Sequence, residues 1–286
     1  MQMLTRKYGY LWDNASGDVS DATRRLETSG ACVVKGVFDE DAVAQLREAI
    51  DEVFAVFPAD RRSEHRAQQA DQQFRYEMLN RSSQCLKAVA NSTILSTIEP
   101  LLGEDCHVIA NTAWRNPPNP NDSAQPWHVD GGPHIPLPAD VLWPPEIPHP
   151  VFAIGCHILL QDCALNDGPT GFIPGSHLSG RPPPYRQALD ANLTYQGQGA
   201  VPLTGEVGDV LLFVSDVWHR RMPTGANDRG RYFLQVHYAR RDIQQRLKTS
   251  DISHQLSDSI LSDLDGKDNS RLRTLVGLHS PGFYDG

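Results

Sequence analysis

A histidine and an aspartate one residue apart, with another histidine far downstream, constrain the fold of this chain most. His128 and Asp130 form the pair, and His219 is the downstream residue. Residues at i and i+2 of a strand point to the same face, whereas on a helix they diverge by about 200°. Two imidazoles and one carboxylate can hold a divalent metal such as Fe(II) on one face and leave other positions open. The pattern therefore needs strands that bring its members together.

The segments around these residues supply such strands. A His-x-Asp pair also arises by chance in a chain of this composition, so the surroundings must support the interpretation. Short apolar-rich runs at 106–114 and 151–161 flank the pair, and a similar run at 208–216 precedes His219. Their length and composition predict strands. We expect all three residues to lie at strand ends.

An arginine follows in a related setting. The turn-forming stretch 223–230 leads into 231–238, a β-branched and aromatic run with Arg231 at its start. The two parallel donors of a guanidinium suit a dicarboxylate held beside a metal. The order His-x-Asp, His, then Arg is much rarer than any one of its parts.

In these motifs the chain resembles the phytanoyl-CoA dioxygenase-like family of Fe(II)- and 2-oxoglutarate-dependent oxygenases. The resemblance runs over a core of about 29–240. It rests on a strand at 29–38 followed by a helix with an acidic cap, and on the pair segment 125–130. It also includes the Gly-Pro-Thr element within 166–177, the Gly-Asp strand that begins at Gly208, and then His219 and Arg231.

The resemblance implies roles for these residues. His128, Asp130 and His219 would bind iron, and Arg231 would bind the far carboxylate of 2-oxoglutarate, which reacts with O2 to give succinate and CO2. Arg231 follows His219 by one residue more than is usual in the family, so Arg229 is a rival. Counting back from the end of the strand favours Arg231. The carboxylate of Asp130 favours hydroxylation over halogenation, because related halogenases lack it.

Weaker assignments concern the surroundings of the site. Thr170 and Asn111 occupy positions where the family often has polar groups near the cosubstrate. For the substrate pocket we predict Trp143, His134 and Arg115. Three further histidines have no ligand spacing and are interpreted as structural or pocket-lining: His149, His157 and His177. The segment 133–150 contains seven prolines and is predicted to be an extended lid loop over the metal.

The expected fold is mainly β with flanking helices, a double-stranded β-helix or jelly roll. Asp39 can cap a helix that carries an apolar stripe, and a second stripe runs from 86 to 102, broken near Pro100. About eight short strands are expected between Cys32 and Tyr238. We predict one domain over 1–286, with a helical extension at 242–286 that acts as a cover or a subunit contact, as in a possible homodimer.

Composition narrows the function further. The net charge of −9 argues against a nucleic-acid partner, and no apolar stretch suits a signal peptide or a membrane span. The five cysteines include no close pair, which predicts reduced thiols and a cytoplasmic enzyme.

The substrate remains open at this level. We expect a small specialised metabolite, as for natural-product tailoring members of the family, with an acyl-CoA or amino-acid-type substrate as the alternative. A zinc hydrolase and a non-catalytic jelly-roll sensor of small molecules are alternatives from other classes.

Overall fold

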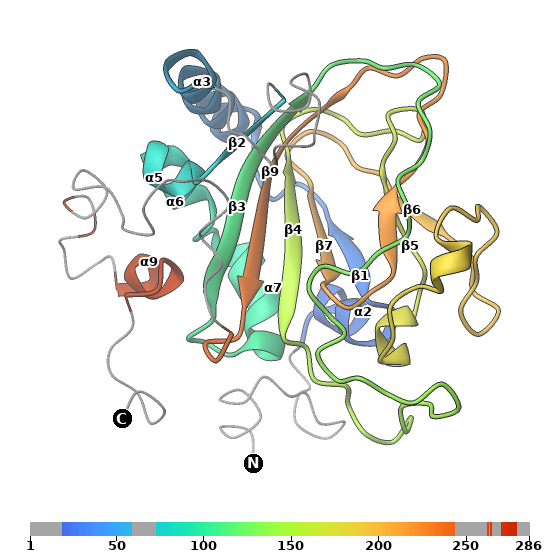
Figure 1. The fold of residues 1–286 in the computed structure, drawn as a ribbon. Coiled ribbons are helices and arrows are strands. Elements are labelled where there is room, and N and C mark those ends of the chain that lie inside the picture. Colours follow the sequence, from blue (N-terminus) through green and yellow to red (C-terminus); the bar gives the residue numbers. More distant parts are fainter. Residues whose placement is uncertain (1–18, 59–72, 244–261, 263, 265–269, 279–286) are drawn as a thin grey trace.

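Two antiparallel sheets face each other in the computed structural model, which describes residues 19–58, 73–243, 262, 264 and 270–278 (Figure 1). The larger sheet has the order β1-β7-β4-β9-β3-β2, and the smaller has the order β6-β5-β8. The larger sheet contains β1 (Ala31–Val34), β2 (Phe74–Tyr76), β3 (His107–Asn116), β4 (Ala153–Leu159), β7 (Val210–Val214) and β9 (Arg231–Ala239). The smaller contains β5 (Thr170–Phe172), β6 (Val201–Leu203) and β8 (His219–Arg221).

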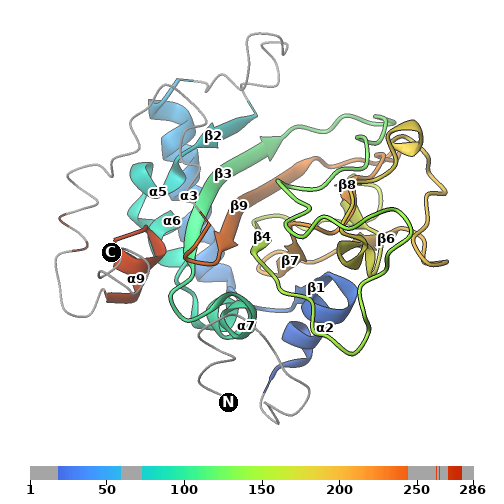
Figure 2. The same cartoon turned by 60° about the horizontal axis from the view of Figure 1, so that its bottom comes forward.

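Helices cover the outer face of the larger sheet, as the turned view in Figure 2 also shows. They are α2 (Asp21–Ser29), α3 (Glu40–Val56), α5 (Met78–Arg81), α6 (Ser83–Ala88), α7 (Ser92–Leu102) and α9 (Ser270–Leu275). Two short 3-10 helices, Ser176–Ser179 and Tyr185–Gln187, lie beyond β5. This arrangement confirms the predicted double-stranded β-helix, in which helices pack on one face of the larger sheet and the smaller sheet packs on the other.

Strand β4 shows how one strand serves both layers. Ile154, Cys156 and Ile158 belong to the core that the helices share, whereas Leu159 belongs to a separate cluster between the two sheets. His157 alternates with these core residues and therefore also faces the smaller sheet. All seven residues of β4 are buried, so both faces of the strand carry mostly apolar side chains.

Helix α3 begins where the sequence predicts. The side chain of Asp39 accepts a hydrogen bond from the backbone N–H of Ala42 at 2.8 Å, and the buried face of the helix carries the predicted apolar stripe. An aspartate at this position contributes about 1 kcal/mol to helix stability. The cap and the stripe together fix α3 against the larger sheet.

Two expectations about elements need correction, and a third is only partly covered by the described residues. The stripe from 86 to 102 forms two helices, and α7 continues through Pro100 because proline removes only one backbone hydrogen bond there. His219 begins β8 and does not close the run at 208–216, since β7 ends at Val214. The C-terminal extension was expected to carry a helical apolar stripe. Of that stripe Leu264 is buried, and residues 256, 260 and 261 lie outside the described residues.

Two expectations about surface and redox chemistry can be compared with the structure. All five cysteines are buried and none forms a disulfide. None of the helices described is long and apolar enough to cross a membrane. The segment 133–150 contains neither helix nor strand, as its prolines predict. Its role as a lid stays a prediction.

Candidate metal centre

The backbone brings the two predicted histidine ligands side by side. The N–H of His128 donates to the carbonyl of His219, and the N–H of His219 donates to the carbonyl of His128, each at 3.0 Å. Their rings lie 4.4 Å apart between centroids. The N–H of Asp130 donates to the carbonyl of Ser215, just beyond β7. The isolated bridge thus replaces the strand end expected for His128, and one ligand atom from each residue lies within 4.8 Å of the others.

Backbone carbonyls orient both imidazole rings. Nδ1 of His128 lies 2.9 Å from the carbonyl of Pro126, and Nδ1 of His219 lies 2.9 Å from that of Val217. A carbonyl only accepts, so each Nδ1 carries the hydrogen and each Nε2 offers a lone pair. The two Nε2 atoms lie 3.8 Å and 3.3 Å from the oxygens of Asp130. Two atoms bound to one ion at about 2.1 Å lie at most about 4.2 Å apart, and both distances are within that limit, so the residues fit a divalent metal.

The carboxyl group of Asp130 is held in its ionised form by its neighbours. Burial alone would raise the pKa of this carboxyl, but the charges of His219, His237 and His128 outweigh burial and lower it. Burial alone would lower the pKa of His219, but Asp130 and the carbonyl of Val217 raise it. Asp130 is therefore ionised, and its negative charge would stabilise a cation bound between Asp130 and the two histidines.

A third histidine lies beside the carboxylate. Nε2 of His237 is 3.9 Å from Oδ2 of Asp130 and 2.9 Å from Nε2 of Gln235. Nε1 of Trp114 donates to Oε1 of Gln235 at 2.7 Å. Because an indole nitrogen only donates, it fixes the orientation of the amide, whose nitrogen then donates to His237. His237 consequently carries its hydrogen on Nδ1, as a donor directed away from Gln235.

A small cavity lies between the two sheets near the metal centre. It is narrow: the space free of protein atoms is about 250 Å³ and includes open solvent, and only about 10 Å³ of it admits the centre of a water molecule. Nine residues from both sheets and their connections line it: His157, Leu159, Gln161, Cys163, Thr170, Leu211, Arg231, Tyr232 and Phe233. Thr170 lies two residues from Phe172, which pairs with His219 across β5 and β8. The cavity thus begins two residues along β5 from the strand partner of His219, a rise of about 7 Å.

The two candidate arginines differ in their surroundings. Arg231 lines the cavity, and its buried Nε has no hydrogen-bond partner. Burial and the nearby charge of Arg221 lower the pKa of Arg231 to about 10, which leaves the guanidinium charged near neutral pH. The side chain of Arg229 is half exposed and pairs with Asp167 at 2.7 Å. Arg231 alone of the two is open to a new anionic partner.

The weaker assignments fare differently. Thr170 is buried and lines the cavity, close to Arg231. Asn111 lies on the opposite face of its strand, where its Oδ1 accepts from the N–H of Leu79 at 3.0 Å. Arg115 also faces the helices, with its guanidinium 2.8 Å from Asp51 and over the ring of Phe54. Asn111 and Arg115 are therefore away from the cavity, and we do not retain them as site residues.

The two remaining pocket candidates lie on the proline-rich segment. Nδ1 of His134 pairs with Asp216 at 2.5 Å, and the ring stacks on Phe152. Trp143 packs edge-on against His149 with 4.6 Å between ring centroids. No contact joins Trp143 to the three candidate ligands in the structure as described. His134 thus attaches the segment to the barrel, whereas Trp143 contacts residues of the segment itself, and contact of either with a substrate stays a prediction.

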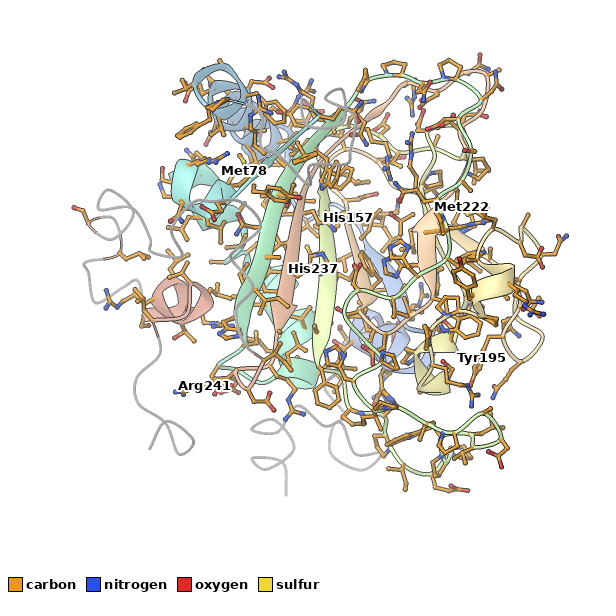
Figure 3. All side chains as sticks on the ribbon, in the orientation of Figure 1. Met78, His157, Tyr195, Met222, His237 and Arg241 are labelled. Carbon is orange, nitrogen blue, oxygen red and sulfur yellow. The ribbon has the colours of Figure 1, made fainter. Side chains whose placement is uncertain are left out.

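Sequence reasoning gave no role in the site to His237 and Gln235, and left His157 without a defined one. Figure 3 labels His157 and His237 in the middle of the larger sheet. The alternation of side chains along β9 could have predicted their place, because Gln235 and His237 lie on the same face of the strand as Arg231. The same alternation in β4 places His157 opposite the smaller sheet.

Comparisons with known proteins agree with this geometry. The family model described as phytanoyl-CoA dioxygenase matches residues 26–228. A search of curated proteins gives no significant match. Among solved structures, apo EctD from S. alaskensis is 21% identical, with 83% of this chain and 82% of that chain covered and a TM-score of 0.61.

Two further structures come from other proteins. SnoK, a non-heme alpha ketoglutarate dependent carbocyclase from nogalamycin biosynthesis, is 20% identical over 80% of this chain and 87% of its own, with a TM-score of 0.59. EvdMO1 is 18% identical over 76% of this chain, with a TM-score of 0.54, and the present chain spans about half of it, 49%. At such identities the likeness shows the fold. The family model covers most of the chain, which therefore belongs to the phytanoyl-CoA dioxygenase family of Fe(II)- and 2-oxoglutarate-dependent oxygenases.

Proposed function

We propose that this enzyme oxidises a C–H bond of a small specialised metabolite, with His128, Asp130 and His219 as its iron ligands. The observation that carries the proposal is the set of two imidazoles and one carboxylate within 4.8 Å, next to a cavity with a buried and unpaired arginine nitrogen. Family membership favours this oxygenase over the zinc hydrolase and the non-catalytic sensor.

Each part of the site has a separate task. His128, Asp130 and His219 would hold the ion, and a set of three protein ligands would leave room for small molecules to bind it. Arg231 would pair with the distal carboxylate of 2-oxoglutarate, and Thr170 lines the same cavity. The rings of Phe213 and Phe233 exclude water from the space between the sheets. When bound, iron and 2-oxoglutarate supply the oxidising chemistry and release succinate and CO2.

The substrate class rests on charge and on the similar folds. A net charge of −9 is a poor match for the phosphate groups of an acyl-CoA, which need a basic surface. SnoK and SnoN come from nogalamycin biosynthesis, and SnoN was crystallised with Fe3+, alpha ketoglutarate and nogalamycin RO. EctD was crystallised with 2-oxoglutarate and 5-hydroxyectoine, so an amino-acid-type substrate is the second candidate.

A reconstitution assay tests the proposal. Purified protein loaded anaerobically with Fe(II) should consume O2 and release succinate when 2-oxoglutarate is added, and the matching metabolite should gain one oxygen atom in mass. The panel should contain natural-product scaffolds, amino-acid derivatives and acyl-CoAs. Retention of zinc with hydrolysis would support a hydrolase, and binding without 2-oxoglutarate turnover would support a sensor.

We also infer that residues 29–240 act as a single oxygenase unit in the cytoplasm, without a nucleic-acid or membrane partner. A homodimer remains a further prediction, which light scattering after size exclusion can test.

A further inference from the structure

His157 has a buried nitrogen atom with no hydrogen-bond partner. The residue lies on β4 and is 6% exposed, with its ring 4.5 Å from that of Phe233 and 5.3 Å from that of Phe213 between centroids. Its Nε2 makes no hydrogen bond. An unpaired polar atom in an apolar interior costs stability, so such an atom needs an explanation.

The surroundings of this nitrogen suggest one. His157 lines the same cavity as Arg231 and Thr170, so strands β4, β5 and β9 each contribute a polar group. Nε of Arg231 also lacks a partner. No acidic side chain is among the lining residues, so the positive charge of Arg231 has no carboxylate within the cavity. The cavity is thus prepared for an anion from outside the chain.

The charge state of His157 fits this role. Burial, and after it the charge of Arg231, lowers the pKa of His157 well below its usual value. The ring is therefore neutral near neutral pH and carries one hydrogen. The N–H of a neutral ring can donate to a carboxylate, and a neutral ring is not repelled by the positive charge of Arg231.

We propose that Nε2 of His157 donates a hydrogen bond to the distal carboxylate of 2-oxoglutarate, the carboxylate that Arg231 pairs with. This inference rests on the proposed function. It makes His157 a residue that selects a dicarboxylate over a 2-oxo acid with a plain alkyl chain. The metal-binding end of the cosubstrate is not affected by His157, because both kinds of acid share the same keto and carboxylate groups at that end.

Binding measurements test the inference without turnover. The full-length protein is loaded with Mn(II), and 2-oxoglutarate is titrated by calorimetry, followed by 2-oxopentanoate, which lacks the distal carboxylate. We expect His157→Leu to weaken 2-oxoglutarate binding by about 10-fold or more, the usual cost of a hydrogen bond to a charged group. Binding of 2-oxopentanoate should change less than about two-fold. His157→Gln, which retains an N–H donor, should recover part of the loss.

A matched control uses another buried histidine. His149 also has a ring nitrogen without a partner, but it lies on the proline-rich segment and does not line the cavity. His149→Leu should leave the affinity for 2-oxoglutarate unchanged. An equal loss for both acids in His157→Leu would assign His157 a structural role only and overturn the inference, as would no loss at all.

Failure of the proposed function would give a different result, because the unaltered protein would then not bind 2-oxoglutarate. Should His157→Leu not fold, nitrogen-15 spectra of histidine in the unaltered protein decide. The His157 signal, assigned by its loss in His157→Gln, should shift with 2-oxoglutarate and stay in place with 2-oxopentanoate. A signal that does not shift with 2-oxoglutarate would reject the hydrogen bond.

Discussion

Single residues at the metal centre owe their orientation to main-chain groups. The rings of His128 and His219 each bond to the carbonyl two residues earlier in the chain, at the same distance of 2.9 Å. Asp130 is fixed through its own N–H to Ser215. Such outer contacts hold the ligand atoms in place before the metal binds, which lowers the cost of ordering them.

The first prediction concerns the three ligands. His128→Ala, Asp130→Ala and His219→Ala should each lower Fe(II) binding and 2-oxoglutarate decarboxylation by more than about 100-fold, since even an outer-shell partner is worth about 10–100-fold. The fold should persist in each variant, but His219→Ala should cost more stability than the other two, because His219 is buried and its ring packs against that of Phe213. Metal analysis and succinate release measure both effects. His107→Ala, at the far end of β3, should keep its metal, and near-normal turnover in any of the three variants would exclude that residue as a ligand.

The second prediction separates the two arginines. Arg231→Leu should raise the 2-oxoglutarate concentration needed for half-maximal succinate formation strongly, because removal of one member of a buried charged pair costs about 2–5 kcal/mol. Arg229→Leu should have little effect, since its half-exposed side chain already pairs with Asp167. Fe(II) binding should persist in both variants. A large change in Arg229→Leu alone would reverse the assignment.

Among the elements, β4 and β7 set the space around the metal centre. Gly155 of β4 pairs with Phe213 of β7, and a Cβ at Gly155 would lie 2.3 Å from the ring of Phe213. The ring of Phe213 in turn lies 4.8 Å from that of His219 between centroids. Glycine is needed here for close approach, and no positive φ is involved. The absence of a side chain at Gly155 thus lets the ring of Phe213 pack against His219, a candidate metal ligand.

The third prediction follows from this contact. Gly155→Ala should destabilise the protein by about 1–3 kcal/mol, because the added methyl group overpacks a buried contact. It should also weaken metal binding, since Phe213 must shift against His219. Denaturant unfolding and metal titration measure the two effects. Gly199→Ala, where an added Cβ meets no atom within 4 Å, is the control. Unchanged stability in Gly155→Ala would contradict the packing argument.

In the whole molecule, the metal centre lies where the two sheets approach each other. His219 belongs to the smaller sheet, whereas Asp130 is tied to the residue that follows β7 of the larger sheet. A bound ion would therefore connect both sheets, and 2-oxoglutarate would add contacts to Arg231 of the larger sheet and Thr170 of the smaller sheet, which line the same cavity. Ligands that bind only the folded state stabilise it in proportion to their affinity.

The fourth prediction tests this connection. Mn(II) and 2-oxoglutarate, each near 100 times its dissociation constant, should contribute about 2.7 kcal/mol each. For a chain of this size that corresponds to a rise in Tm of roughly 5 °C or more per ligand. A chelator should reverse the effect of the metal. His219→Ala should show no metal-dependent shift, and a full shift in that variant would place the bound metal elsewhere.

The sequence by itself predicted the fold class, because the alternation and length of its apolar runs depend only on local geometry. It also placed His128 and Asp130 on one face, since residues at i and i+2 of an extended segment share a face, whereas the addition of His219 to them rested on the family resemblance. Arg231 was preferred over Arg229 by counting from the end of one strand. These inferences needed no knowledge of which strands are neighbours.

Only the tertiary structure decided which face of each strand meets the cavity. Strands β3 and β4 are buried on both sides, so apolar patterning does not distinguish the helix side from the metal side. A register shift between Val108 and Ala110 changes the alternation within β3, and Asn111 and Arg115 consequently face the helices. His157 gained its candidate role in the same way. Its buried nitrogen became informative only when β9 and β5 placed Arg231 and Thr170 around the same cavity.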